Sequence, residues 1–507
     1  MTSSWRRSSS LKRSRDTMAD DNGNVLDTLE LGSVRRIHLV GVAGTGMGSF
    51  AGMLKAAGYD VTGSDENVYP PMSDMLRTWG IPAATPYRPE NLDAAKPDLV
   101  IIGNVIRRVN PEATAVRERG LKQMSFPAAL GSLFLDRSHS VVVAGTHGKT
   151  TTSSLMAHVL VAAGKDPSFL VGGVTQNYAG NYRVGKGPHF VVEGDEYDTA
   201  YWDKGSKFLH YRPRTAILTS VEFDHADIFR DLPHYEATFE KFVRLIPQDG
   251  QLVVCAAYPN AVKLAREGCP GRVVTYVAKE GADADYTPRN LSFGPEGARF
   301  DVVARGEVQG TVQLPMGGAH NVENALAVIA AAQGLGLTFD EIAQGLATFS
   351  GVKRRQEIRG EPDGVLVIDD FAHHPTAVRE TIAAIHHRYP ERRLWAIFEP
   401  RSNTSRRNIH QEDYAHAFPG AARASLKVPE RHDKVPVGEE LDVRKLITDL
   451  QAQGIPAEGS TDVQALVDLA AREARPGDVL LVMSNGAFGG FIDKVLAALA
   501  ARAQKGA

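Results

Sequence analysis

The chain has few cysteines and almost no excess of charge. Only two of its 507 residues are cysteine, Cys255 and Cys269, and no CxxC spacing occurs. This excludes a disulfide framework and a cysteine-rich metal site, and it makes a reducing cytoplasm the expected location. The 57 basic and 60 acidic residues leave a formal net charge of −3, too little for general attraction to nucleic acid or an anionic membrane. Any anionic ligand must therefore be bound by local groups.

Long hydrophobic runs are also lacking. No apolar stretch approaches the ~20 residues that span a bilayer, so we expect a soluble protein without a membrane partner. Apolar residues nevertheless make up 43% of the chain. At roughly 150 residues per domain, the length predicts about three domains, each with its own core.

The N-terminal stretch MTSSWRRSSSLKRSRD is rich in Ser and Arg but has no apolar core of a secretory signal. A disordered basic tail, a misassigned start upstream of a true start at Met18, and an organelle transit peptide all fit this composition. The first two are simpler. We predict a disordered basic tail over residues 1–33.

Apolar runs and glycine turns alternate from Arg35 onward. RRIHLVG, YDVTGSD and PDLVIIGN are typical of strands separated by helices, SVVVAGT opens a second series, and VLVIDDF, RRLWAIFEP and DVLLVM form a third. This alternation predicts an α/β fold with parallel sheets and crossover helices. We place the domains at 34–138, 139–351 and 352–507.

The stretch AGTHGKTTT, between a predicted strand and helix, is a candidate phosphate loop. Backbone N–H groups at a helix N-terminus bind phosphate, Lys149 adds positive charge against the β and γ oxygens, and the Thr150 hydroxyl is placed for Mg²⁺. The loop is shorter than GxxxxGK[ST], because Val143 stands where the first glycine is expected. A helix cap that contains a lysine is the structural alternative. The residues of the candidate loop are Gly145, Thr146, His147, Gly148, Lys149, Thr150 and Thr151.

Carboxylates and a histidine follow two later strands. HFVVEGDEYD places Glu193 directly after an apolar run, with three more acidic residues behind it, and VEFDHADIF places His225 beside Asp224. Carboxylate oxygens at strand ends are usual Mg²⁺ ligands beside a phosphate loop. A solvated acidic turn and a capping histidine are the structural alternatives.

Polar residues at other strand and helix ends are further candidates. GVAGTGMG resembles a dinucleotide fingerprint, with Asp65 near the place of a ribose-binding acid, but its glycines depart from GxGxxG. Asn321 and Asn324 stand in the first turn of a predicted helix, as caps or as groups that face a base. KRRQE and VIDDFAHHP read as surface charge or as site residues. EPRSNT and SNGAFGG follow strands where open α/β sheets bind ligands.

Taken in order, GVAGTGMG, GSDENVYPPMS, AGTHGKTTT, EGDEYD, EFDHADIF, HNVENALA, DDFAHHP, EPRSNT and SNGAFGG resemble the Mur ligase family. These motifs extend from about residue 35 to 490, so the resemblance covers nearly all of the chain except the tail. It implies a Rossmann-like UDP-sugar domain, a central P-loop ATPase domain and a C-terminal Rossmann-like domain for the amine substrate.

EPRSNT and SNGAFGG resemble the members that use a peptide as the amine. For these, the resemblance implies joining of L-alanyl-γ-D-glutamyl-meso-diaminopimelate to UDP-N-acetylmuramate in murein recycling, with ATP and Mg²⁺, through an acyl phosphate. The expected partners are small molecules, and the expected assembly is a monomer or weak homodimer.

The resemblance also implies roles for individual residues. Lys149, Glu193, His225 and Arg355 are the implied catalytic residues, and Thr150, Glu193 and His225 the implied metal ligands. The phosphate loop, Asn321, Asn324, Arg355 and Asp370 are assigned to the nucleotide. The UDP-sugar is assigned to Gly44, Thr45, Gly46, Met47, Gly48 and Asp65, and the tripeptide to Arg401, Ser402, Asn403, Ser484 and Asn485.

One position departs from several members of the family. These carry a carbamylated lysine four residues after a tyrosine, but counting from Tyr235 gives Phe239, and Lys241 is out of register. We therefore predict no modified lysine.

Three alternatives stay open. An L-alanine ligase of the same family would use the same nucleotide and sugar residues. A nicotinamide oxidoreductase would rest on Gly41 to Gly48, and a nucleotide-dependent binding module would form no bond.

Overall fold

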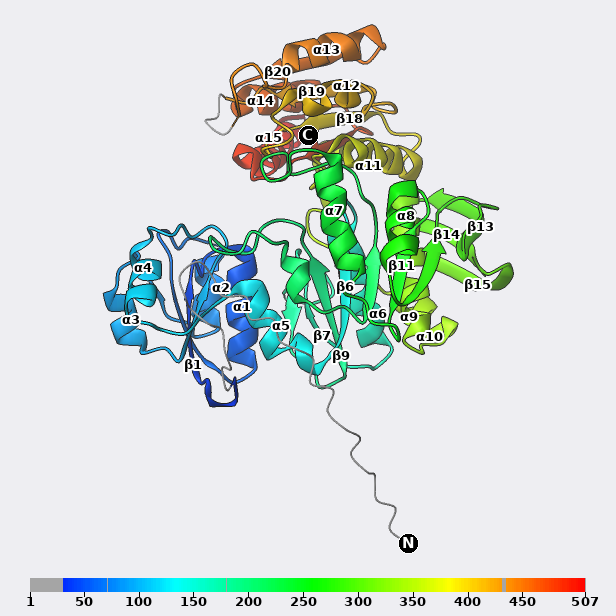
Figure 1. Cartoon of the computed structure of the whole chain (residues 1–507). Coiled ribbons are helices and arrows are strands. Elements are labelled where there is room, and N and C mark those ends of the chain that lie inside the picture. Colours follow the sequence, from blue (N-terminus) through cyan, green and yellow to red (C-terminus); the bar gives the residue numbers. More distant parts are fainter. Residues whose placement is uncertain (1–30, 71, 179, 431–434, 507) are drawn as a thin grey trace.

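The computed structural model describes residues 31–70, 72–178, 180–430 and 435–506. In these residues the strands form three separate sheets that follow one another along the chain. Figure 1 shows the N-terminal sheet at one side of the central sheet and the C-terminal sheet above them. The predicted α/β fold with three units is therefore confirmed.

Most of the predicted tail, residues 1–30, lies outside the described residues. The last part of that prediction is wrong, because Leu31–Ser33 form a short 3-10 helix, η1, directly before the first strand.

The N-terminal sheet has five parallel strands in the order β3-β2-β1-β4-β5. Its inner strands β1 and β4 are nearly continuous apolar runs because helices cover both faces of such a sheet. The strands are β1 (Arg36–Val40), β2 (Asp60–Ser64), β3 (Ala83–Ala84), β4 (Leu99–Ile102) and β5 (Gln123–Ser125). The helices are α1 (Thr45–Ala56), α2 (Met72–Thr78), α3 (Glu90–Ala95), α4 (Pro111–Glu118) and α5 (Phe126–Leu133).

The central sheet has ten strands, in the order β15-β14-β13-β12-β11-β10-β6-β9-β7-β8. Its parallel part is β6 (His139–Ala144), β7 (Ser168–Leu170), β9 (His189–Gly194), β10 (Thr215–Leu218), β11 (Gln251–Cys255) and β12 (Arg272–Tyr276). Antiparallel pairs extend both ends: β8 (Tyr182–Arg183) at one, and β13 (Tyr286–Gly294), β14 (Gly297–Ala304) and β15 (Glu307–Leu314) at the other. The helices are α6 (Lys149–Ala162), α7 (Leu232–Val243), α8 (Pro259–Gly268), α9 (Ala319–Gly334) and α10 (Phe339–Ala347).

The C-terminal sheet has the order β16-β17-β21-β18-β19-β20 and is parallel except for β16 at its edge. Its strands are β16 (Glu357–Gly360), β17 (Leu366–Asp370), β18 (Leu394–Phe398), β19 (Arg423–Lys427), β20 (Ala457–Ser460) and β21 (Val479–Met483). Its helices are α11 (Pro375–Arg388), α12 (Gln411–Ala415), α13 (Val443–Ala452), α14 (Val463–Glu473) and α15 (Phe491–Gly506).

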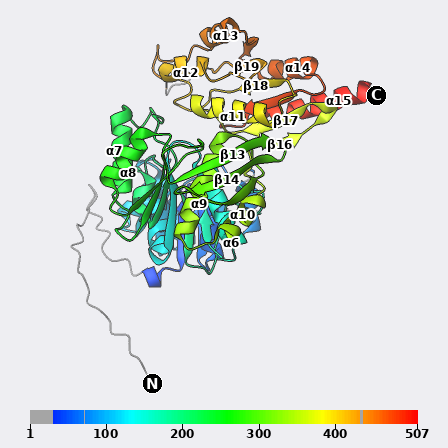
Figure 2. The same ribbon diagram turned by 90° about the vertical axis from the view of Figure 1, so that its right-hand side faces the viewer.

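The three units meet through few side chains. Between the first two, the Ser49 hydroxyl donates to Asn181 Oδ1 at 2.7 Å, and the rings of Trp79 and Tyr182 meet edge-on at 5.3 Å. Figure 2 shows α11 on the side of the C-terminal unit that faces the central unit. There Arg388 Nε donates to the Pro295 carbonyl at 3.1 Å.

None of the helices in the described part of the chain has the length and apolar character that crossing a bilayer requires.

Candidate active site

The phosphate loop lies between β6 and α6, at the carboxyl end of the central strands. Gly145 and Gly148 have φ of +131° and +79°, which L side chains rarely adopt. A Cβ on Gly148 would also lie 2.7 Å from Asn324 Oδ1. The loop can therefore keep the tight turn that exposes the first amides of α6, where an anion is favoured.

Lys149 lies inside this loop and is held by a buried carboxylate. Its Nζ donates to the Gly145 carbonyl at 2.5 Å and to Glu196 Oε2 at 2.9 Å. Burial opposes the charged form of Lys149, but Glu196 outweighs it and raises the lysine pKa. Burial likewise opposes ionisation of Glu196, yet Lys149 and then His225 lower its pKa to about 2. Both groups are thus charged at neutral pH.

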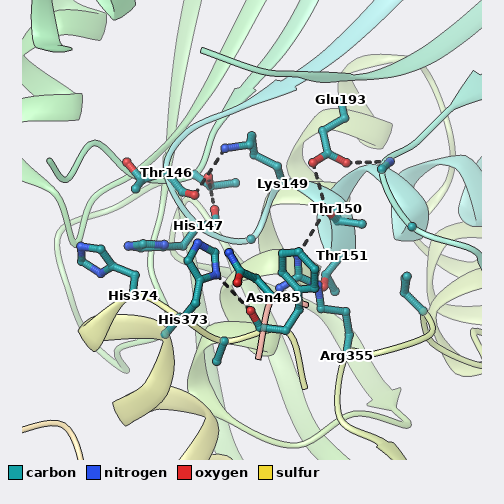
Figure 3. Close-up of a pocket in the computed structure, with 18 of the residues that line it drawn as sticks. Thr146, His147, Lys149, Thr150, Thr151, Glu193, Arg355, His373, His374 and Asn485 are labelled. Atoms are coloured by element: carbon teal, nitrogen blue, oxygen red, sulfur yellow. Dashed lines mark hydrogen bonds between the residues drawn. The ribbon is translucent and has the colours of Figure 1, made fainter. Parts of the chain in front are cut away.

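Thr150 and Glu193 lie together, as the metal prediction requires. The Thr150 hydroxyl donates to Glu193 Oε1 at 2.9 Å, and the Gly172 N–H donates to Oε2 at 2.8 Å. Burial, and then Asp195, raise the pKa of Glu193. A hydroxyl and a carboxylate beside further negative charge fit the hard oxygen ligands of Mg²⁺. Figure 3 shows this pair to the right of Lys149, joined by a dashed line.

His225 faces Glu196 in the structure. Its Nε2 lies 3.1 Å from Glu196 Oε1, and its backbone has φ of +52°. Burial opposes protonation, but Glu196 outweighs it and raises the pKa of His225 to about 9. A metal ligand must be the neutral ring, so the predicted metal role of His225 requires loss of one ring proton and stays a prediction.

Phe239 is buried in α7 and packs against Tyr235 and Phe208, with ring centroids 5.1 and 5.6 Å apart. Lys241, on the same helix, lines a separate cavity of about 420 Å³.

The two predicted asparagines form one polar cluster at the start of α9. Neither caps the helix, because its N-cap is Gly318 without a side-chain hydrogen bond. Asn321 Nδ2 donates to the Gly317 carbonyl at 2.8 Å, Asn324 Nδ2 donates to Asn321 Oδ1 at 3.2 Å, and the Thr152 hydroxyl donates to Asn324 Oδ1 at 2.9 Å. The cluster therefore joins α9 to the phosphate-loop helix.

Arg355 and Asp370 come from the start of the C-terminal unit and differ in their contacts. Arg355 Nη2 reaches the Thr150 hydroxyl at 3.4 Å, and its guanidinium lies 4.9 Å from the Phe371 ring centroid. The Asp370 oxygens accept from the Gln356 and Ala372 backbone N–H groups at 2.8 and 2.7 Å. Asp370 thus fixes the loop that carries Arg355 beside Thr150.

The predicted peptide residues lie on two neighbouring loops of the C-terminal unit. Arg401 lies against Gly486, where an added Cβ would be 2.0 Å from its Nη1. The Ser484 hydroxyl donates to Glu399 Oε2 at 2.5 Å and accepts from the Gly486 N–H at 2.9 Å. Ser484 and Glu399 therefore brace the loops and hold Arg401 in place.

Ser402 and Asn403 have different partners. Ser402 caps its own turn by accepting from Ser405 N at 2.9 Å. Asn403 Nδ2 donates to Asp227 Oδ2 of the central unit at 2.8 Å. Asn485 Oδ1 is buried and has no hydrogen-bond partner within the described part of the chain.

The predicted sugar residues start α1. Gly44 is its N-cap, and a Cβ on Gly48 would lie 2.2 Å from Met72 Sδ. Asp65 Oδ2 accepts from the Ala43 N–H at 2.8 Å and Oδ1 from the Tyr87 hydroxyl at 3.0 Å. Asp65 therefore shapes the glycine loop through both of its oxygens.

One cavity of about 1310 Å³ brings the three units together. It is lined by Thr45, Gly46, Thr146, His147, Gly148, Lys149, Thr150, Thr151, Glu193, His225, Asn321, Asn324, Arg355, Asp370, Arg401, Ser402, Asn403 and Asn485. The other predicted residues, Gly44, Met47, Gly48, Asp65, Gly145 and Ser484, lie outside its lining and support the loops around it.

Two lining or supporting residues were missed from the sequence. Glu196 was visible as one of the four carboxylates of EGDEYD, but nothing in the sequence singled it out as the partner of Lys149. Lys207 lines the cavity, donates to Asp195 Oδ2 at 3.0 Å and lies 4.1 Å from the Tyr197 ring centroid. No sequence motif marks it.

Family models match all three units. The model described as Mur ligase family, catalytic domain, matches residues 36–138, the Mur ligase middle domain matches 143–332, and the Mur ligase glutamate ligase domain matches 354–486. The chain belongs to the Mur ligase family. It is accordingly an ATP-dependent ligase, and the expected resemblance is confirmed.

Individual relatives of this Mur ligase cover nearly its whole length. It is 40% identical over 92% of the chain to UDP-N-acetylmuramate–L-alanyl-γ-D-glutamyl-meso-2,6-diaminoheptandioate ligase of Escherichia coli (strain K12), and the match covers 99% of that protein. A solved murein peptide ligase of Psychrobacter arcticus superposes with a TM-score of 0.67 at 36% identity, covering 92% of this chain and 98% of the other. A UDP-N-acetylmuramate–alanine ligase of Thermotoga maritima gives 0.74 at 26% identity, covering 93% and 100%.

The family assignment excludes two of the three alternative functions. The relatives named above are ligases, and the phosphate loop is in place, so neither a nicotinamide oxidoreductase nor a binding module without chemistry accounts for this chain.

Proposed function

We propose that this Mur ligase joins the tripeptide L-alanyl-γ-D-glutamyl-meso-diaminopimelate to UDP-N-acetylmuramate, with cleavage of ATP to ADP and phosphate, in murein recycling. The observation that carries the proposal is the 40% identity, over nearly the full length of both chains, to the E. coli ligase whose name contains these substrates. The domains of this reaction are residues 34–138 for the UDP-sugar, 139–351 for ATP and 352–507 for the tripeptide, and residues 1–33 lie outside them.

The reaction proceeds in two steps. The γ-phosphoryl group passes from ATP to the lactyl carboxylate of the sugar, which turns a poor electrophile into an acyl phosphate. The tripeptide amine then attacks the carbonyl carbon, the C–N bond forms, the C–O bond to phosphate breaks, and the amine loses a proton. ADP and inorganic phosphate are released.

Phosphoryl transfer needs positive charge around the moving group. Lys149 supplies it from the phosphate loop, and Glu196 keeps the ammonium charged and inside the loop. The first amides of α6 add backbone donors. Thr150 and Glu193 would hold Mg²⁺, which would neutralise phosphate charge, and Asn321 and Asn324 would face the adenine.

Arg355 makes the nucleotide site depend on the C-terminal unit. Its Nη2 lies 3.4 Å from the Thr150 hydroxyl. The nucleotide site is therefore complete only when the C-terminal unit is closed over the central sheet, as it is here. Arg401 pairs with a tripeptide carboxylate, for which a planar guanidinium is well suited. Ser402, Asn403 and Asn485 surround the same substrate, braced by Ser484, and the α1 loop from Gly44 to Gly48, shaped by Asp65, binds the UDP-sugar.

The second candidate is the L-alanine ligase of the same family, favoured by the TM-score of 0.74 to the Thermotoga maritima enzyme. It would use the same ATP and sugar residues with a smaller amine. Against it stand the lower identity of 26% and the EPRSNT and SNGAFGG loops.

A phosphate-release assay separates the candidates. Purified full-length protein receives ATP, Mg²⁺ and UDP-N-acetylmuramate with L-alanine, tripeptide or tetrapeptide, and a reaction without the sugar serves as the control. We expect release with tripeptide and none without the sugar. Release with L-alanine but not with tripeptide would overturn the proposal in favour of the alternative.

Two further properties are also proposals. We infer a monomer or weak homodimer, measurable by sedimentation of the purified chain over a range of concentrations. We also infer a cytoplasmic location, since the named substrates of the E. coli relative carry UDP and the cysteines are unpaired; cell fractionation measures it.

A further inference from the structure

A cluster of two imidazoles and one carboxylate lies between the central and C-terminal units, and of its three members only His147, a residue of the phosphate loop, has a role in the ligase chemistry above. His147, Glu222 and His374 each offer one ligand atom, and the three atoms lie within 4.8 Å of one another. His147 Nε2 and Glu222 Oε2 are 2.9 Å apart, and the ring centroids of His147 and His374 are 4.5 Å apart. Figure 3 shows the two rings side by side.

The ligand atoms are buried, and apart from the close approach of His147 Nε2 to Glu222 Oε2 they have no partner among the described residues. His147 Nε2, Glu222 Oε2 and His374 Nε2 are all inaccessible to solvent, and none makes a well-aligned hydrogen bond within the described residues. The His374 side chain is only 7% exposed. Three buried polar atoms that converge without such bonds are costly unless something else satisfies them.

The backbone around each ligand is fixed. The His147 N–H donates to the Ser220 hydroxyl at 2.9 Å, and the His147 carbonyl accepts from the Thr219 hydroxyl at 2.5 Å. The Glu222 backbone pairs with the Thr146 hydroxyl, and Glu222 Oε1 accepts from the Thr376 hydroxyl at 3.2 Å. Oε2 therefore remains for a ligand.

The charge states suit a cation. Burial opposes ionisation of Glu222, but its contact with His147 outweighs burial and lowers the pKa of the carboxyl; a bound metal would replace that contact. Burial, and then His147, hold the pKa of His374 well below its usual range, so this ring is neutral at pH 7. Metals bind the neutral imidazole and the ionised carboxylate.

We propose that His147, Glu222 and His374 form a transition-metal site, distinct from the Mg²⁺ site at Thr150 and Glu193, that joins the phosphate loop to the C-terminal unit. Two imidazoles and one carboxylate favour Zn²⁺, Co²⁺ or Ni²⁺ over Mg²⁺, which prefers oxygen. A fourth position is left for water.

Binding requires small adjustments. Tetrahedral ligands of a metal at about 2.0–2.1 Å lie roughly 3.4 Å apart. The separations, all within 4.8 Å, must therefore shrink by at most about 1.4 Å, and the 2.9 Å between His147 Nε2 and Glu222 Oε2 must widen by about 0.5 Å. Side-chain rotation supplies both changes. The Thr376 N–H donates to His374 Nδ1 at a long 3.3 Å. That bond places the ring proton on Nε2, so ligation through Nε2 uses the other tautomer and gives up this bond.

Cobalt spectroscopy tests the site in the full-length protein. Co²⁺ is titrated in excess Mg²⁺ without ATP, because four-coordinate Co²⁺ with nitrogen ligands absorbs strongly in the visible, whereas six-coordinate Co²⁺ on oxygen ligands absorbs weakly. We expect one equivalent with strong bands. Glu222→Gln and His374→Asn should each weaken Co²⁺ binding at least tenfold and remove the bands.

Two control variants separate this site from other places where Co²⁺ could bind. Glu193→Gln removes a carboxylate from the Mg²⁺ cluster, and His189→Gln breaks the His139–His189 pair, whose rings are 5.7 Å apart at the start of β6 and β9. Both should keep the strong bands. Circular dichroism confirms that each variant is folded. Bands that survive in folded Glu222→Gln and His374→Asn, or no strong bands in the wild-type chain, would overturn the proposal.

Discussion

The nucleotide side and the peptide side of the cavity differ in how their charged side chains are held. Lys149, Glu196 and His225 are linked to one another at 2.9 to 3.1 Å. On the peptide side, Arg401 makes no ion pair within the described residues, and Asn485 Oδ1 is buried there without a hydrogen-bond partner. The central sheet thus builds the site for the common reaction in advance, while the C-terminal loops leave donors and acceptors for the substrate that varies between family members.

Removing the charge at the centre of the nucleotide side should have the largest effect. Lys149→Ala is expected to lower the rate of phosphate release by at least about 10³-fold, because a single donor to a developing charge contributes about 10²–10³-fold and Lys149 also binds the nucleotide. The fold should persist, since Glu196 keeps His225 and the Tyr235 hydroxyl as partners. Lys165→Ala, just beyond the other end of α6, is the control. Turnover near the wild-type rate would contradict the role of Lys149.

Removing a predicted metal ligand is a second way to disrupt the nucleotide side of the cavity. Glu193→Gln should raise the Mg²⁺ concentration for half-maximal activity by more than about tenfold. Loss of a residue that only supports a metal ligand already weakens metal binding about 10–100-fold, and Glu193 is a predicted ligand itself. The KM for tripeptide should stay unchanged. Asp198→Asn, which loses only an exposed pair with Lys204 at 2.6 Å, is the matched control. An unchanged Mg²⁺ requirement would exclude Glu193 as a ligand.

A substitution on the peptide side of the cavity should weaken tripeptide binding without weakening ATP binding. Arg401→Lys keeps the charge but loses the planar fork, so we expect the KM for tripeptide to rise about tenfold, corresponding to about 1.4 kcal/mol of a charge-assisted hydrogen bond. The KM for ATP should not change. Arg475→Lys, at an exposed position of the same unit, should change neither value. An equal rise in the KM for tripeptide and the KM for ATP would show that the peptide side and the nucleotide side of the cavity are not independent.

The smallest expected effect concerns stability on the nucleotide side. The pKa of His225 is raised from 6.5 to about 9, because Glu196 outweighs the opposing effect of burial. Its contribution, on the order of 1–3 kcal/mol, is therefore fully present below pH 6.5 and is lost as pH rises through about 9. His225→Gln should lower Tm at pH 6 but flatten the fall in Tm between pH 6.5 and 9. Exposed His386→Gln should follow the wild-type curve.

The strand ends that carry the site could be predicted from the sequence, whereas the pairing of the charges could not. AGTHGKTTT and EGDEYD follow apolar runs, so parallel sheet geometry brings Lys149 and Glu193 to the same edge. EGDEYD contains four neighbouring carboxylates, and only Glu196 faces Lys149. Its position depends on a hydrogen bond from the Tyr235 hydroxyl, 39 residues away in the chain. No local pattern contains that information.

Other differences have similar causes. Asp65, Asp370 and Ser484 stand in motifs and were assigned to ligands, but their oxygens hold the backbone or a neighbouring side chain in the loops around the cavity. The antiparallel strands β13 to β15 were missed because their half-exposed residues lack the apolar runs of the parallel strands. Hairpin pairing between these neighbouring strands stabilises them instead.

The edge-on contact of Trp79 with Tyr182 gives the protein an internal optical reporter. The indole belongs to the N-terminal unit and the phenol to the central sheet, so any rotation of one unit against the other changes the surroundings of this tryptophan. Trp395, in contrast, is buried in the C-terminal sheet below Arg423 and supplies a constant background. Trp202, whose ring meets Tyr201 edge-on at 4.6 Å beside the N-terminal core, reports on the same boundary as Trp79. Stopped-flow emission could therefore time rotation of the N-terminal unit in the unlabelled chain.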